Sequence, residues 1–145
     1  SRNSDHEYFI YYLKTKDNLL KIGQWPSVAD FQIPQAEKYR KIIGEEQYKE
    51  FTRGIGLSAH GVGIGSFVYL RRVFENLIEE AYTSAQAENK EFSNEDYVRA
   101  RMDDKIQMVK DYLPDFLVEN RTLYSILSKG IHDLSEDECL NTLRL

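Results

Sequence analysis

The segment 54–81, GIGLSAHGVGIGSFVYLRRVFENLIEEA, constrains the fold of this chain more than any other part of the sequence. It opens with closely spaced glycines and continues without a break into a stretch of helical periodicity. In that stretch, a predicted helix over 66–85, the apolar side chains form one stripe: Phe67, Leu70, Phe74, Leu77, Ile78 and Ala81. A helix with one apolar face must pack against other elements, so the segment predicts a helical domain.

Further helices are predicted from apolar periodicity and end signals, over residues 34–43, 45–59, 93–113, 119–131 and from 135 onward. Pro34 suits the first turn of the first helix, and Gly44 ends it. Ser93 or Asn94 caps the third helix, after a polar loop over 86–92. Ser135 opens the last helix with a capping box, because a glutamate follows three residues later.

The beginning of the chain differs from the rest. Two short apolar runs, 8–15 and 19–24, flank a Lys-Asp-Asn turn and predict a β-hairpin. A connector over 23–34 follows, which we expect to be irregular and held to the helices by Trp25 and Phe31. The predicted fold is therefore mainly α, a compact bundle of five or six helices with a short N-terminal β-hairpin. Residues 1–33 form the hairpin and connector, and residues 34–145 the bundle.

Composition excludes several classes of function. The formal net charge of −5 disfavours a protein that binds nucleic acid by bulk electrostatics, since that requires an excess of Lys and Arg on one face. One cysteine, Cys139, permits neither an internal disulfide nor a zinc site of several thiolates. No metal-ligand set and no cofactor motif is recognised. Cysteine usage leads us to expect a cytoplasmic protein. The chain opens without Met and stops inside an apparent helix, so we expect a fragment of a longer protein.

The glycine segment has two interpretations. A glycine-rich loop before a helix can bind phosphate through backbone N–H groups and the helix dipole, which makes His60, Gly61 and Gly63 candidate ligands. The spacing matches neither a P-loop nor a dinucleotide-binding fingerprint. The alternative is that the glycines allow two helices to approach closely or kink one helix. His60 is then a partly buried, hydrogen-bonded side chain, rather than a residue at the rim of a pocket.

Two further polar clusters lie on predicted helices. Arg71, Arg72 and Glu75 are at neighbour spacing, so they form a solvated, ion-paired face, or one arginine turns inward to hold a carboxylate or phosphate. Near the C-terminus, four polar residues spaced four, three and four positions apart form one stripe along a helix: Arg121, Ser125, Ser128 and His132. Lys129 lies beside this stripe. His132 suits proton transfer, and it equally suits a role in capping its helix.

The segments YLRRVFENLIEEA, Lys105-Ile106 leading to Tyr112-Leu113-Pro114, and LYSILSKGIH together resemble the HEPN superfamily of helical nucleotide-binding domains, over about 66–138. The resemblance is strongest to an uncharacterised bacterial branch. It implies a small helical bundle that dimerises side by side. In active members, an arginine five to seven positions before a histidine joins it in metal-independent RNA cleavage. Here those positions hold Leu127, Ile126 and Ser125, so the resemblance favours a non-catalytic role.

Three functions are therefore predicted. The first is a non-catalytic HEPN-like dimerisation and ligand- or RNA-associated regulatory module of a bacterial cytosolic protein, with a homodimer formed through helices. The second is a metal-independent ribonuclease in which His132 works with Lys129 or with Arg71 or Arg72. The third is a small-molecule sensor with a pocket between the glycine segment and the helix at Arg71, bordered by Gly61, Gly63 and Arg72. Ser128 and Glu75 are further candidate ligand residues.

Overall fold

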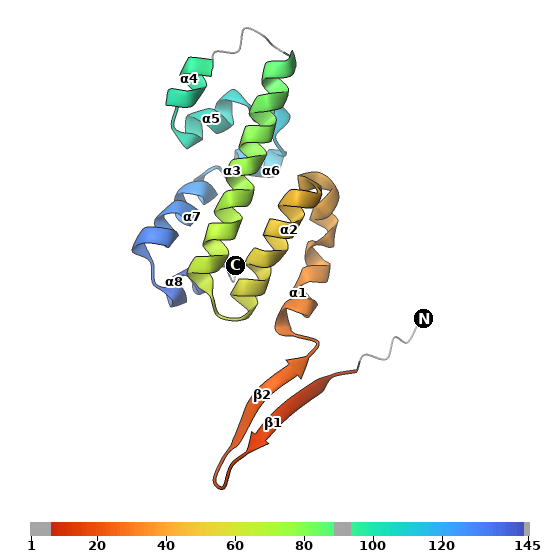
Figure 1. Cartoon of the computed structure of the whole chain (residues 1–145). Coiled ribbons are helices and arrows are strands. Elements are labelled where there is room, and N and C mark those ends of the chain that lie inside the picture. The colour runs from red at the N-terminus through yellow and green to blue at the C-terminus, as the bar shows by residue number, and fades with distance from the viewer. Residues whose placement is uncertain (1–6, 89–93, 144–145) are drawn as a thin grey trace.

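A computed structural model describes residues 7–88 and 94–143, and its elements surround one long helix, α3 (Figure 1). The strands are β1 (Phe9–Lys14) and β2 (Leu19–Trp25). The α-helices are α1 (Val28–Ala36), α2 (Arg40–Ala59), α3 (Gly63–Glu88), α4 (Asn94–Arg99), α5 (Met102–Met108), α6 (Asp115–Glu119), α7 (Thr122–Asp133) and α8 (Glu136–Leu143). Two short 3₁₀ helices are η1 (Glu37–Tyr39) and η2 (Lys110–Tyr112). A mainly α fold with an N-terminal hairpin is therefore confirmed.

The core lies along α3, which packs against α2, α7 and α8. The predicted apolar stripe faces inward: Phe67, Phe74, Leu77, Ile78 and Ala81 are buried, and Leu70 is half-buried. At the far end of α3, buried side chains of the shorter segments complete the core: Tyr97, Ile106, Val109, Leu113 and Leu117. There the rings of Tyr82 and Tyr97 stack with centroids 3.7 Å apart. In the described part of the chain, no helix is both long enough and apolar enough to span a membrane.

The region predicted as an irregular connector contains a helix. Helix α1 begins at Val28 because Ser27 and Asp30 form a capping box. The Ser27 N–H donates to the Asp30 carboxylate at 2.7 Å, and the Asp30 N–H donates to the Ser27 hydroxyl at 3.3 Å. Pro34 consequently lies inside α1, and the prediction that Pro34 opens a helix was wrong. The cap signal outweighed the proline signal.

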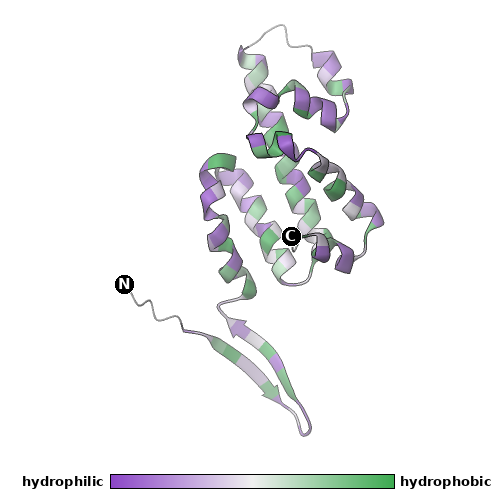
Figure 2. Ribbon diagram, turned by 180° about the vertical axis from the view of Figure 1, so that it is seen from behind, coloured by the Kyte–Doolittle hydropathy of each residue, from purple (hydrophilic) through white to green (hydrophobic). Residues whose placement is uncertain are grey.

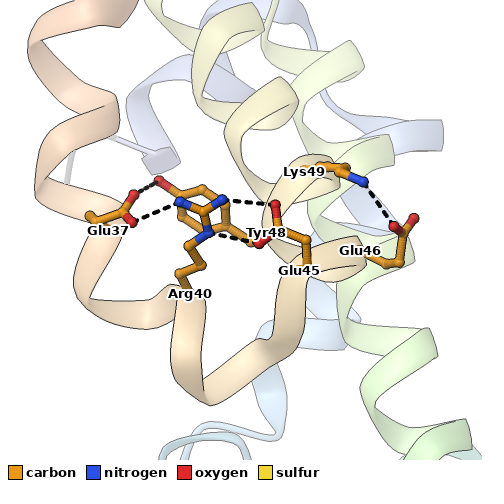
Figure 3. Close-up of polar contacts among 6 residues, drawn as sticks. All are labelled: Glu37, Arg40, Glu45, Glu46, Tyr48 and Lys49. Carbon is orange, nitrogen blue, oxygen red and sulfur yellow. Dashed lines mark hydrogen bonds and ion pairs between the residues drawn. The ribbon is translucent and has the colours of Figure 1, made fainter.

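Gly44 forms the corner between α1 and the long part of α2. Its φ of 77° and ψ of 166° interrupt the helix where the sequence predicted a break. The Arg40 guanidinium spans this corner, donating to both oxygens of Glu45 at 2.7 and 2.9 Å and to Glu37 at 2.9 Å (Figure 3). The Tyr48 hydroxyl donates to the other Glu37 oxygen at 2.7 Å. These contacts fix the direction in which α2 leaves the corner.

The second half of the chain forms shorter helices than its apolar periodicity predicted. The single helix predicted over 93–113 is divided into α4, α5 and η2. Arg101, with φ of −70° and ψ of 161°, is extended and separates α4 from α5, and Val109, with φ of −112° and ψ of 16°, separates α5 from η2. Helix α3 continues through Glu88, so the loop predicted from residue 86 starts too early. The rest of that loop, and Ser93, lie outside the described residues. Ser135 caps α8 as predicted, and its N–H donates to Glu138 at 2.8 Å.

The hairpin extends away from the helices at the end of the bundle where α1 begins (Figure 1). Strands β1 and β2 are antiparallel, with Phe9 opposite Trp25 and Lys14 opposite Leu19. Trp25 and Phe31, which we expected to hold an irregular connector to the helices, are themselves the last residue of β2 and a residue of α1. The Trp25 ring lies 6.0 Å from Phe9, and the Phe31 ring stacks on Tyr8 at 5.6 Å.

Candidate functional site

An open cavity of about 550 Å³, here called the polar cavity, lies between the start of α5 and α7. It gathers the C-terminal candidates together with residues of a second element: Arg101, Met102, Asp103, Tyr124, Ser125, Ser128, Lys129, His132 and Asp133. Lys129 and His132 are exposed in it, and Ser128 is half-buried. Arg121, the remaining member of the predicted stripe, is the N-cap residue of α7 and does not line the cavity.

Arg101 is the residue that sequence reasoning missed. It reaches the polar cavity because the chain turns out of helical conformation there and α5 starts one residue later. Acidic Asp103 and Asp104 occupy the first turn of α5, as is typical of a new helix start, and this was the signal available in the sequence. Arg101, Lys129 and His132 can supply cationic donors to an anion, while Asp103 and Asp133 limit how anionic that ligand can be.

Tyr124 links the polar cavity to the arginine cluster of α3. Its hydroxyl donates to Glu75 at 2.8 Å, and the Arg71 Nε donates to the same carboxylate oxygen at 2.9 Å. The Arg71 guanidinium also lies over the Tyr124 ring, 5.5 Å from its centroid. The hydrogen bond with Glu75 raises the pKa of Arg71, and burial followed by the same carboxylate raises the pKa of Tyr124. Arg71 is thus the arginine of the pair that turns inward.

Arg72 and His60 lie elsewhere. Arg72 is exposed and donates to Glu50 of α2 at 3.0 Å, so it belongs to the ion-paired face. His60 ends α2, and its Nδ1 is 2.8 Å from the Gly56 carbonyl oxygen. Its side chain is exposed rather than partly buried. Neither residue lines the polar cavity.

The glycine segment brings α3 against α8. A Cβ on Gly63 would lie 2.7 Å from the backbone oxygen of Glu136 and 2.8 Å from the Cβ of Cys139, so only glycine allows this approach. The N–H groups of Gly63 and Ile64 both donate to the Glu136 carboxylate. The helix N-terminus therefore already binds an anionic group of the chain itself. Gly61, with φ of 82°, makes the turn that precedes it.

A second cavity, here called the apolar groove, has a volume of about 420 Å³ and runs between α2, α3, α6, α7 and α8. Its lining is almost wholly apolar and includes Tyr39, Ile42, Phe51, Leu70, Phe74, Phe116, Leu123, Ile126, Leu127 and Leu143. Phe116 and Ile42 are 61% and 59% exposed, which is high for large apolar side chains gathered at one place. Sequence periodicity did not reveal this groove, because its residues come from five α-helices and from η1.

Comparisons with protein-family models, with curated proteins and with solved structures found no match. Among residues 7–88 and 94–143, no group of three or more His, Cys, Asp or Glu side chains is arranged to hold a metal ion. Neither the polar cavity nor the apolar groove is bordered by Gly61, Gly63 or Arg72, the residues expected around a small-molecule pocket.

Proposed function

We propose that this chain is a non-catalytic HEPN-like dimerisation module, the regulatory part of a bacterial cytosolic protein. The observation that carries the proposal is the apolar groove. Large apolar side chains, Phe116 and Ile42 among them, stay exposed at the groove, and an exposed apolar cluster is a feature of surfaces that bind a partner. A second copy, contacting it through helices, is the partner that the family resemblance favours.

The groove is suited to a helix–helix contact. Phe116 of α6 and Ile126 of α7, which is 39% exposed, stand on its rim, while Phe74 and Leu77 of α3 form its floor. Two copies related by a twofold axis would place the rim of one against the groove of the other, which is a self-complementary contact. RNA or a nucleotide would bind in the polar cavity, which holds the basic side chains Arg101 and Lys129.

Sedimentation velocity tests the dimer. Ile126→Glu places a charge on the groove rim, and we expect it to remove the helical contact, which lowers the sedimentation coefficient from that of wild type with unchanged helical circular dichroism. Val98→Glu is the matched control, because Val98 is 66% exposed on α4 and does not line the groove. A wild-type chain that sediments as a monomer at high concentration would remove the proposal. Equal behaviour of the two variants would also count against it.

A metal-independent ribonuclease is the second candidate, favoured by one observation. The polar cavity contains His132, Lys129 and Arg101. Arg101 supplies the arginine that α7 lacks at the positions before His132, and it could act as the basic partner in cleavage. Labelled single-stranded RNA would be incubated in EDTA with the wild-type chain and with His132→Ala and Arg101→Ala. Loss of cleavage in both variants supports this candidate. Cleavage at the same rate by all three proteins assigns the activity to a contaminant.

A further inference from the structure

The hairpin leaves most of its apolar side chains in water. From Tyr8, the residue before β1, to Leu13, every side chain is between 46% and 59% exposed. Figure 2 shows apolar positions on both strands, which extend away from the bundle. An isolated two-stranded hairpin is only marginally stable in water, and it needs another strand or a packing surface. The hairpin therefore requires a partner that the helices do not supply.

The two outer edges of the hairpin differ. Strand β2 carries Lys21 and Gly23, and Ile22 between them is a bulge, since Tyr11 pairs with Gly23 and Tyr12 with Lys21. A lysine and a bulge are the features with which proteins prevent an edge strand from pairing further. Strand β1 has no bulge residue, glycine or proline, and its one charged residue, Lys14, is at its end next to the turn. In the described part of the chain no other strand lies beside it. Only β1 is built to accept another strand.

We propose that β1 pairs antiparallel with β1 of a second copy of this chain, forming a four-stranded sheet in the order β2–β1–β1–β2. The second copy supplies what this edge requires, a strand of the same length whose only charge, on Lys14, lies at its end. The twofold axis of such a pair passes between one residue and its own copy, which lie directly opposite each other. Tyr11 is the centre of the seven residues from Tyr8 to Lys14, so pairing the whole stretch places Tyr11 opposite Tyr11.

This register gives favourable neighbours on both faces. It sets Phe9 opposite Leu13 and Ile10 opposite Tyr12, which are pairs of aromatic and aliphatic side chains. The assembly is closed, because its remaining outer edges are the two β2 strands with their lysines and bulges. The contact lies on a different part of the molecule from the apolar groove, and it goes beyond the proposed helical dimer. Each contact can therefore be removed without the other.

The first test uses charge at the twofold axis, in the Ile126→Glu background so that the groove does not contribute. Tyr11→Lys and Tyr11→Glu each place like charges opposite each other, and we expect each to raise the dissociation constant by about tenfold or more. An equimolar mixture of the two variants should restore association as a mixed pair. Ile22→Lys, on the bulge of β2, should leave association unchanged.

These outcomes distinguish the proposal from misfolding and from the groove dimer. Recovery in the mixture shows that the variants fold. No recovery, or an equal effect of Ile22→Lys, overturns the proposed pairing whatever the groove binds. An Ile126→Glu chain that is monomeric at all concentrations also overturns it.

The second test is cross-linking. Tyr11→Cys, oxidised with copper phenanthroline, should form a disulfide between copies, because opposite residues of antiparallel strands lie within disulfide reach. Leu13→Cys is the matched control on the same strand and face: it lies opposite Phe9, well away from its own copy. Native Cys139 is buried and should not react. Equal cross-linking of both variants would show chance encounter and overturn the proposed register.

Discussion

The Tyr124 hydroxyl and the Arg71 guanidinium donate to one and the same oxygen of Glu75, at 2.8 and 2.9 Å. This shared acceptor joins α7 to α3 across the edge of the core. It also positions Tyr124, which lines the polar cavity. We expect Tyr124→Phe to lower the free energy of unfolding by about 1 kcal/mol, since the hydrogen bond is lost and the ring remains.

Urea unfolding followed by circular dichroism measures this loss. Tyr112→Phe is the control, because its hydroxyl also donates to a carboxylate, that of Glu88 at 2.7 Å, but at an exposed site. The loss there should be smaller. A Tyr124→Phe loss no greater than that of Tyr112→Phe would show that the shared acceptor adds nothing to stability.

Gly63 and Gly56 should respond oppositely to substitution by alanine. Gly63→Ala forces a Cβ to 2.7 Å from the backbone of α8, so we expect a loss of about 1–3 kcal/mol in unfolding free energy. Nothing lies within 4 Å of a Cβ on Gly56, which is inside α2. Gly56→Ala should therefore stabilise by about 0.5–1 kcal/mol. Thermal unfolding of both variants, compared with wild type, decides the point, and a stable Gly63→Ala would show that α8 does not pack as described.

The contact between Glu136 and the start of α3 makes a further prediction. Glu136→Ala leaves the N–H groups of Gly63 and Ile64 without this carboxylate, and the expected loss is about 1 kcal/mol. Asp137→Ala is the control, being exposed on the next position of the same helix. Chemical denaturation of the two variants gives the difference. Equal midpoints would mean that water replaces Glu136 without cost.

The corner at Arg40 should make stability depend on pH. The hydrogen bond from Tyr48, followed by that from Arg40, lowers the pKa of Glu37 from 4.5. The hydrogen bonds from Arg40 lower the pKa of Glu45 from the same value. A carboxyl group whose pKa is lower in the folded state than in the unfolded state stabilises the fold at pH values above its unfolded-state pKa. That stabilisation is lost as the pH falls through the folded-state pKa. Wild-type stability should therefore fall between about pH 5 and pH 3 more steeply than that of Arg40→Ala. Parallel pH profiles would contradict this.

The sequence predicted those elements that local chemistry determines. The apolar stripe of α3, the break at Gly44 and the Ser135 cap each depend on residues a few positions apart, and all three are present. The errors occurred where two local signals competed. Ser27 with Asp30 started α1 before Pro34, and the extended Arg101 divided a helix whose apolar period continues across it.

The candidate sites were harder to predict, because they join separate elements. Ser125, Ser128, Lys129 and His132 were placed together correctly, since they share one face of α7. Arg101 comes from a different helix, and no spacing along the chain connects it to His132. Glu136 likewise occupies the start of α3 across 73 positions of sequence, which only tertiary structure reveals.

The position of Trp25 has a consequence for spectroscopy. It is the only tryptophan of the chain, it is 59% exposed, and it lies on the hairpin rather than in the helical core. Tryptophan fluorescence, excited at the red edge of absorption, therefore reports on the hairpin, while the helical signal of circular dichroism reports on the bundle. The two signals need not change together during unfolding, and a shift in emission with protein concentration alone would register contact at the hairpin.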